Sequence, residues 1–317
     1  MSAGAPSSIR DPRARGRWSR IGRTLWNEKY LWLMALPGLL FFVIYKYLPM
    51  LGVVIAFKDY NMMLGIGDSK WVGLKHFYRI FENPDIGRIF LNTLIISLYQ
   101  IVFAFTIPIF LAIMIHEVTQ RVFKRMLQTV FYMPHFLSWV VVAGIFYLMF
   151  QSDGAVNNML ADMGMSKIDI LSNPDNFRSM LVMQVIWKES GWGTIIYLAA
   201  LSSIDVELYE AAKMDGAGRL RQIWNITLPG IRSTIVVLFI LRLGTVLDVG
   251  FEQIFLMLNP SVRDVGEVIE TYVYQAGVVN GNFSFSTAVG LMKGLIGLIL
   301  IYGANKLAKR MGERGVF

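Results

Sequence analysis

The sequence predicts an all-α membrane protein with six transmembrane helices. Only 16% of the residues are charged and the mean hydropathy is +0.51, whereas an average soluble domain carries about 25% charged residues. Six segments are mostly apolar over about 20 residues, the length that a helix needs to cross a hydrocarbon core about 30 Å thick. These segments are residues 31–55, 91–115, 126–150, 179–201, 233–258 and 283–305.

The six segments differ in regularity. The fourth is interrupted by Lys188, Glu189 and Ser190, and the fifth is long enough to extend beyond the bilayer. The first is too long for the apolar part of a signal peptide and no small-residue cleavage site follows it, which favours a retained anchor. Residues 30–310 are therefore expected to form the membrane domain. Residues 1–29, which are rich in Ser, Pro and Arg, are expected to be a largely disordered tail, and residues 311–317 a second tail.

The distribution of Lys and Arg predicts the orientation in the membrane. Segments 1–29, 116–125, 202–232 and 304–317 hold 18 basic and 8 acidic residues, whereas segments 56–90, 151–177 and 259–282 hold 7 basic and 11 acidic residues. Since basic residues accumulate in cytoplasmic loops, the first set is expected to be cytoplasmic. Both termini then lie inside, which agrees with an even number of spans.

Composition and motifs exclude several classes of function. The net charge of +8 comes from basic residues beside apolar spans, where lipid headgroups and orientation explain it without nucleic acid. No Cys is present and the three His residues stand far apart, so no metal site or catalytic group is expected. The sequence contains no Gly-x-x-x-x-Gly-Lys-Ser/Thr. The chain is therefore not expected to bind or hydrolyse ATP, or to carry a cofactor.

Two of the predicted outer loops have helical periodicity. Leu74, Phe77, Tyr78 and Phe81 share one face, and so do Val265, Ile269, Tyr272 and Val273. Both patterns predict short amphipathic helices that lie on neighbouring spans or on the membrane interface. Either surface could also receive an external partner.

The cytoplasmic segment 202–230 is patterned as a helical hairpin. Ser202 and Asp205 fit a capping box at a helix start, and an apolar face follows at Ile204, Leu208, Ala211 and Ala212. Gly216 and Gly218 predict a turn. A second short apolar face follows at Leu220, Ile223, Trp224 and Thr227. Pro229 suits the first position of the next span.

The residues of this hairpin resemble a known signature. Glu210-Ala211-Ala212, three residues, Gly216, nine residues, Ile226, one residue and Leu228-Pro229 match the motif of binding-protein-dependent ABC importer permeases in type and spacing. The resemblance implies a type I importer transmembrane domain. It also implies that this loop is the coupling helix that enters a groove on an ATPase subunit. The residues implied in docking are Glu210, Ala211, Ala212, Asp215, Gly216, Leu228 and Pro229.

Weaker similarities extend over nearly the whole chain from Tyr30. The carbohydrate-uptake branch is resembled at Tyr209, Asp215-Gly216-Ala217, Asn92-Thr93-Leu94 and Gly73-Leu74 with Phe77. The stretch from Leu36-Pro37-Gly38 through Phe57-Lys58-Asp59-Tyr60 resembles permeases for pectin- and alginate-type oligosaccharides. The resemblance implies four partners: a second related permease, two ATPase subunits that use ATP and Mg²⁺, and an external sugar-binding protein. Cargo would cross the bacterial inner membrane by alternating access.

Polar residues within the spans are candidates for the substrate path. Charges in or beside the spans are Lys46, Lys188, Glu189, Arg242, Asp248, Glu252 and Lys293. Intramembrane charges usually face a partner or an aqueous cavity. Hydrogen-bonding and aromatic groups that could meet a sugar are Gln184, Trp187, Asp248, Glu252 and Gln253. These groups could instead pair with one another, line a subunit interface or extend to the headgroups. The basic residues could also attract an acidic oligosaccharide.

Two alternatives remain open from the sequence. The chain could be an ABC importer permease for a solute other than a sugar. It could also be an ion-coupled secondary transporter, for which Asp248 and Glu252 at i and i+4 are the candidate ion site.

Overall fold

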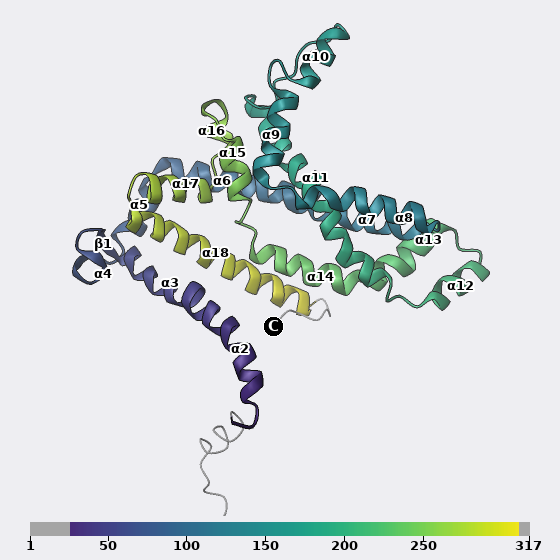
Figure 1. Ribbon diagram of the computed structural model, residues 1–317, viewed down its shortest axis with the longest axis horizontal. Coiled ribbons are helices and arrows are strands. Elements are labelled where there is room, and N and C mark those ends of the chain that lie inside the picture. Colours follow the sequence, from purple (N-terminus) through teal and green to yellow (C-terminus); the bar gives the residue numbers. More distant parts are fainter. Residues whose placement is uncertain (1–25, 311–317) are drawn as a thin grey trace, which may run out of the picture. The chain divides into compact units, whose positions relative to one another are not determined.

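The computed structural model describes residues 26–310, which are helical apart from one small hairpin of strands and the connecting loops (Figure 1). The chain divides into two compact units, residues 1–54 and 55–317, so the division falls inside the predicted membrane domain. The predicted tail 311–317 lies outside the described residues. So does the predicted tail 1–29, except for residues 26–29, and α2 begins at Lys29.

The first unit contains one long helical segment. It comprises α2 (Lys29–Phe42), the π-helical turn η2 (Val43–Tyr47), α3 (Leu48–Met50) and the start of the 3₁₀ helix η3 (Leu51–Phe57). Every residue from 26 to 51 is exposed. An apolar helix that is exposed on all sides is suited to lipid or to a partner in the membrane.

Proline and π-helical turns occur together in three helices. Pro49 follows η2, Pro108 follows η4 (Gln100–Ala104), and Pro229 follows η6 (Ile223–Thr227). In each turn an N–H is bonded to the carbonyl five residues earlier, as from Leu48 to Val43. Because proline cannot donate a backbone hydrogen bond, the wider turn lets the helix pass it without ending.

Five helical segments of the described chain are long and apolar enough to cross a membrane. They are Lys29–Phe57, Pro84–Glu117, Trp139–Asp162, Arg219–Gly244 and Phe283–Arg310. The predicted span 179–201 lies within α11 (Pro174–Leu201), which has 28 residues but is not among the five. Lys188, Glu189 and the polar residues around them lower its mean hydropathy. The count of six spans therefore stays a prediction.

The predicted third span, 126–150, is wrong as one helix. The structure has α8 (Arg121–Tyr132), the 3₁₀ turn η5 (Met133–Phe136) and α9 (Trp139–Phe150), which is followed by α10 (Ala155–Asp162). Pro134 interrupts the backbone bonding. Ser138 then starts a new helix, because its hydroxyl accepts a hydrogen bond from the Val141 N–H at 3.3 Å.

The predicted fifth span, 233–258, is also wrong as one helix. α14 (Leu228–Gly244) ends at Gly244 and α15 (Phe251–Met257) begins after a nonhelical segment, residues 245–250. Gly250 has φ of 103°, a conformation that glycine adopts without steric cost. Two side chains of the second span donate to carbonyls of this segment: Ser97 to Val246, and Gln100 to Val249 at 2.9 Å.

A small subdomain follows the first long helical segment. Strands β1 (Lys58–Asn61) and β2 (Ser69–Trp71) pair antiparallel around α4 (Gly65–Asp68), and α5 (Lys75–Glu82) follows. The predicted amphipathic helix at residues 74–81 is confirmed as α5. Its packed face, however, is His76 and Ile80, whereas Tyr78 and Phe81 are exposed.

The second predicted amphipathic helix, at residues 265–273, is wrong as a continuous helix. The structure has η7 (Pro260–Val262), α16 (Arg263–Gly266), α17 (Ile269–Tyr274) and η8 (Gln275–Val279). Buried side chains of α6 (Pro84–Tyr99) bind the break between α16 and α17. Asn92 donates to the carbonyls of Asp264 and Glu267, and Thr93 accepts from the Ile269 N–H. These contacts give Asn92-Thr93 a structural role.

The second unit is organised around α11. This helix packs along α7 (Thr106–Glu117) and also contacts α6, α8, α14 and α16, while α14 packs on α18 (Phe283–Arg310). One core cluster joins Phe177 and Leu181 of α11 to Val142 of α9 and Ile254 of α15. Figure 1 shows α14 alongside α18, and α12 (Val206–Met214) and α13 (Arg219–Gln222) far from α5 and α17.

The contact between α11 and α8 requires a glycine. A Cβ at Gly191 would lie 1.9 Å from the Phe131 carbonyl oxygen, whereas a Cβ at Gly144 would meet no atom within 4 Å. We expect Gly191→Ala to lower the free energy of unfolding by about 1–3 kcal/mol, the usual cost of overpacking. We expect Gly144→Ala to be neutral or slightly stabilising. Thermal unfolding of the two purified variants measures the difference, and equal melting temperatures would contradict the close approach.

The packing of α5 should depend on pH through His76. This ring is buried, and burial lowers its pKa below 6.5 even though the Asp59 carboxylate, 3.8 Å away, opposes the shift. The folded subdomain therefore disfavours the protonated ring, while the opened segment takes up a proton. Stability should be fully present above pH 6.5 and should fall as the pH drops below that value.

Hydrogen exchange can measure this pH dependence locally. Protection factors for residues 58–82 should decrease between neutral and acidic pH in the wild type. In His76→Gln they should be nearly independent of pH. Equal slopes in the two proteins would contradict the role of His76.

Candidate functional site

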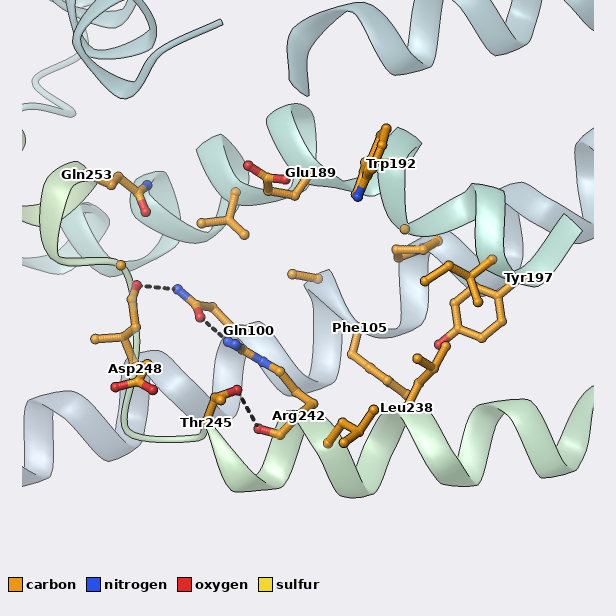
Figure 2. A pocket seen from close by; sticks show the side chains of 18 of the residues that line it. Gln100, Phe105, Glu189, Trp192, Tyr197, Leu238, Arg242, Thr245, Asp248 and Gln253 are labelled. Atoms are coloured by element: carbon orange, nitrogen blue, oxygen red, sulfur yellow. Dashed lines mark hydrogen bonds between the residues drawn. The ribbon is translucent and has the colours of Figure 1, made fainter. Parts of the chain in front are cut away.

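A cavity of about 600 Å³ lies inside the second unit, between α7, α11 and α14. Its lining changes character from one end to the other (Figure 2). Phe105, Tyr197 and Leu238 lie at the apolar end, and Pro108, Ile196 and Leu241 also line the cavity. Gln100, Arg242, Thr245, Asp248 and Gln253 lie at the polar end, and Glu189 lies between the two ends. Trp139 and Trp192 add two indole rings to the wall.

The polar end is organised around Gln100. Its amide nitrogen donates to the Val249 carbonyl at 2.9 Å, and its amide oxygen accepts from Arg242 Nη2 at 2.5 Å (Figure 2). One side chain thus connects the break in the fifth span to the guanidinium group of α14. Because both ends of the amide are bonded, the Gln100 side chain and the guanidinium are held in a fixed relation.

A charged cluster forms the wall at Glu189. One carboxylate oxygen accepts from Lys188 Nζ at 2.9 Å, and the other lies 2.7 Å from His135 Nδ1. Lys188 is buried, and it also donates to the His135 carbonyl at 2.9 Å and stands 5.3 Å from the centroid of a Trp139 ring. The His135 ring stacks on Trp192, with ring centroids 4.5 Å apart. The cluster therefore holds both tryptophans in place.

The residues predicted for the substrate path occupy different places. Asp248 and Gln253 line the cavity. Gln184 is fully buried and does not line it, but its amide oxygen accepts from Gln253 Nε2 at 2.7 Å. Trp187 and Glu252 are exposed and are not among the lining residues. A role in transport stays a prediction for all five.

Asp248 and Glu252 do not form the paired carboxylates that the sequence suggested. Their spacing of i and i+4 would place them on one face only if the helix were continuous, and α15 begins after Gly250. The Asp248 carboxylate instead forms an ion pair with Lys293 of α18. Lys293 also binds Glu270 at 2.9 Å. The shared helical face on which this ion site was predicted is therefore absent, because the two residues do not belong to one helix.

Sequence reasoning did not connect several cavity residues. Arg242 stood out only as one of several basic residues that could attract an acidic oligosaccharide, and Glu189 only as a charge in a span. Gln100, Trp139 and Trp192 were not singled out. A glutamine within an apolar span was a usable signal, because a polar side chain at membrane depth needs a partner. The partner itself depends on tertiary contacts that periodicity does not contain.

A second candidate site is the loop between α11 and α14. Asp205 is the N-cap of α12, since its carboxylate accepts from the Glu207 N–H at 3.0 Å. The predicted capping box with Ser202 is wrong, because the Ser202 hydroxyl donates back to Leu198 in α11. Gly216 has φ of 72°, so the predicted turn after α12 is confirmed.

The second arm of this hairpin differs from the prediction. Residues 219–244 form one continuous helical segment, made of α13, η6 and α14. Pro229 therefore lies inside this segment, directly after the π-helical turn, and does not begin a separate helix. Tyr209 of α12 contacts Thr227 of η6, with their hydroxyl oxygens 3.1 Å apart. This contact ties the two arms together.

The predicted docking residues are mostly on the surface of this loop. Glu210, Ala211, Asp215, Gly216 and Pro229 are exposed, while Ala212 and Leu228 are half-buried. The predicted apolar face is divided, because Ile204 and Ala212 pack inward whereas Leu208 and Ala211 face outward. Large apolar side chains are also exposed here: Met214 at 89%, Leu220 at 74% and Trp224 at 70%. Such a surface is suited to a protein partner.

Comparison with known proteins gives a consistent family. Residues 104–313 match the family described as "Binding-protein-dependent transport system inner membrane component". The chain is 50% identical over 292 residues to the polygalacturonan/rhamnogalacturonan transport system permease protein YteP of Bacillus subtilis (strain 168), with 92% of this chain and 91% of that protein covered. It is 51% identical over 292 residues to protein LplB of the same organism, with 92% of each covered.

A solved structure has the same fold over nearly its full length. It is the crystal structure of a bacterial ABC transporter involved in the import of the acidic polysaccharide alginate. The TM-score is 0.85 and the sequence identity 38%, and the match covers 92% of this chain and 99% of that one.

The charged cluster at Glu189 generates a stability prediction. Lys188→Met removes a buried cation that holds the Glu189 carboxylate and the His135 carbonyl. We expect the free energy of unfolding to fall by about 1–3 kcal/mol, the cost of leaving buried polar groups unpaired. Lys306→Met, at an exposed position of α18, is the matched control.

A second substitution tests the pairing itself. Lys188→Met combined with Glu189→Gln should be less destabilising than the sum of the two single changes, because neither charge is then left alone. Strictly additive changes in melting temperature would contradict the coupling.

Proposed function

Because the chain belongs to the family of binding-protein-dependent transport system inner membrane components, we propose that it is the permease subunit of an ABC importer for oligosaccharides. The observation that carries this proposal is the cavity, which joins aromatic rings to fixed polar groups inside the membrane domain. The exposed loop 202–230 supports coupling to a separate source of energy.

The cavity has the chemistry that a sugar requires. Sugar hydroxyls need hydrogen-bonding groups, which Gln100, Thr245 and Gln253 provide. The C–H faces of sugar rings pack against aromatic side chains, which Trp139 and Trp192 provide. Pockets of roughly 300–1,000 Å³ usually hold small ligands, so the volume of about 600 Å³ suits a short oligosaccharide or part of a longer one.

The relatives support the same class of cargo. YteP is described as a permease for polygalacturonan and rhamnogalacturonan, and the matched structure belongs to an alginate importer. A second structure of the alginate transporter, with a TM-score of 0.86, holds a periplasmic protein bound to an alginate pentasaccharide. We extend to this chain both the oligosaccharide cargo and its delivery by an external binding protein.

The energy for transport is proposed to come from partner subunits. The sequence lacks a nucleotide-binding motif of the Gly-x-x-x-x-Gly-Lys-Ser/Thr type, so two ATPase subunits would bind ATP and Mg²⁺. The hairpin of α12 and the turn at Gly216 would enter a groove on one of them, with Glu210 meeting a basic side chain. A second, related permease would complete the pathway.

The orientation follows from the charge distribution. With both termini in the cytoplasm, loop 202–230 faces the ATPase subunits, while α5, α10 and α17 face outward. Closure of the ATPase dimer would move the loop, and the helices would expose the cavity alternately to the two sides. The joined arms at Tyr209 and Thr227 support this role, because a rigid hairpin transmits displacement.

Uptake by the reconstituted importer tests the proposal. Proteoliposomes that contain the permease pair and ATPase subunits, with the binding protein outside, should accumulate a labelled uronate-containing oligosaccharide only when ATP is enclosed. Glu210→Ala should reduce uptake at least about tenfold, the loss expected from one charge-assisted contact. Gly216→Pro should reduce it further, because proline cannot adopt a φ of 72°.

Controls separate a docking defect from misfolding. Glu82→Ala removes an exposed carboxylate of α5, far from the loop, and should leave uptake unchanged. The melting temperature of Glu210→Ala should equal that of the wild type. Normal uptake in both loop variants would contradict the assignment of loop 202–230 as the docking site. Uptake that is driven by an ion gradient without ATP would contradict the proposal of an ABC importer.

A further inference from the structure

We propose that Arg242 selects oligosaccharides that carry carboxylate groups. The inference rests on the proposed function and adds a substrate class and a specificity-determining residue to it. It starts from the balance of charges around the cavity, where Arg242, Glu189 and Asp248 are the charged lining residues.

Both cavity carboxylates are bound by cations that do not line the cavity. Glu189 accepts from Lys188 and is contacted by His135. Asp248 forms its ion pair with Lys293, which belongs to the neighbouring pocket of α18. Lys293 is shared with Glu270, but among the described residues neither cavity carboxylate forms an ion pair with Arg242.

Arg242 has no such partner among the described residues. Its guanidinium donates to a neutral group, the Gln100 amide oxygen, at 2.5 Å, and no ion pair to it is found within residues 26–310. Asp248 acts on it electrostatically, but through space and while bound to Lys293. A guanidinium has five N–H donors, and Gln100 accepts from one of the Arg242 nitrogens at the cavity wall.

The position of the guanidinium is fixed before any ligand arrives. Gln100 is buried and bonded at its other end to the Val249 carbonyl, so it cannot turn away from Arg242. Figure 2 shows the guanidinium between Gln100 and Thr245, at the polar end of the cavity. A preorganised donor loses less freedom on binding than a mobile one.

Carboxylate is the ligand chemistry that this arrangement favours. A guanidinium fork matches the two oxygens of a carboxylate, and such charge-assisted bonds are stronger than bonds to neutral hydroxyls. A cation without a carboxylate in contact is costly within a membrane domain, and such groups often serve a transported or bound ligand. Uronic acid units carry one carboxylate each, and the matched importer takes the acidic polysaccharide alginate.

Binding of an acid and its ester tests the inference. The probes are trigalacturonate, its methyl ester, and the neutral trisaccharide maltotriose. The complete importer in nanodiscs, without binding protein, is titrated with each probe at pH 7 by calorimetry. Fluorescence of Trp139 and Trp192 in the cavity wall gives a second readout. The wild type should bind the acid more tightly than the ester.

Substitution of Arg242 should act on the acid alone. Arg242→Gln should weaken trigalacturonate binding at least about tenfold, as expected for a lost charge-assisted bond, and should leave the ester nearly unchanged. Arg242→Lys should be intermediate, because it keeps the charge but loses the fork. Arg232→Gln, on the same helix but not among the lining residues, should preserve the preference of the wild type.

Each contrary result is distinguishable. If Arg242 only braces Gln100, the substitution will weaken acid and ester in parallel, which overturns the inference. Equal binding of acid and ester by the wild type, or binding of maltotriose alone, overturns it as well, yet leaves an oligosaccharide importer in place. Failure of the proposed function would appear instead in the uptake assay, as no ATP-dependent accumulation of any oligosaccharide.

Discussion

The hydrogen bonds that Gln100 and Ser97 donate to the nonhelical segment 245–250 are the constraint on which much of this structure depends. Inside an apolar slab a backbone carbonyl without a partner costs several kcal/mol, so a nonhelical segment at membrane depth needs donors from elsewhere. Val246 and Val249 receive theirs from the second span. The break could not persist without those side chains.

The break creates the cavity. Where α14 stops at Gly244, the chain moves aside and re-enters as α15, which brings Asp248, Gly250 and Gln253 to the cavity wall. Gln100 donates a hydrogen bond to the Val249 carbonyl at the break and also orients the Arg242 guanidinium. The path of the chain at the break and the position of the Arg242 guanidinium therefore depend on the same amide. A substitution of Gln100 should change both the stability of the break and the position of the Arg242 guanidinium. A substitution of Arg242 itself changes the guanidinium and leaves the hydrogen bond from Gln100 to Val249 in place.

Sequence reasoning located the elements that depend on local chemistry. Apolar length predicted most of the long helices, and Gly216 predicted the turn after α12 because a positive φ favours glycine. It failed where tertiary contacts replace helical hydrogen bonds. The sequence predicts residues 245–250 as the middle of a transmembrane helix. Their nonhelical path is stable because Ser97 and Gln100, on another helix, donate hydrogen bonds to their carbonyls. The break at Pro134 could have been predicted more easily from the sequence, because proline removes a backbone hydrogen-bond donor wherever it lies.

The two candidate sites differ in predictability for the same reason. The loop 202–230 is a contiguous stretch, so the cap at Asp205 and the turn at Gly216 follow from neighbours in sequence, whereas its packed face depends on tertiary contacts. The cavity joins Gln100, Glu189 and Arg242 from three helices that are distant in sequence. Its binding properties depend on which of the charged side chains are already paired. Lys188 and Lys293 were as conspicuous in the sequence as Arg242, but each binds a carboxylate. What distinguishes Arg242 is a neutral partner, and that property exists only once the chain has folded.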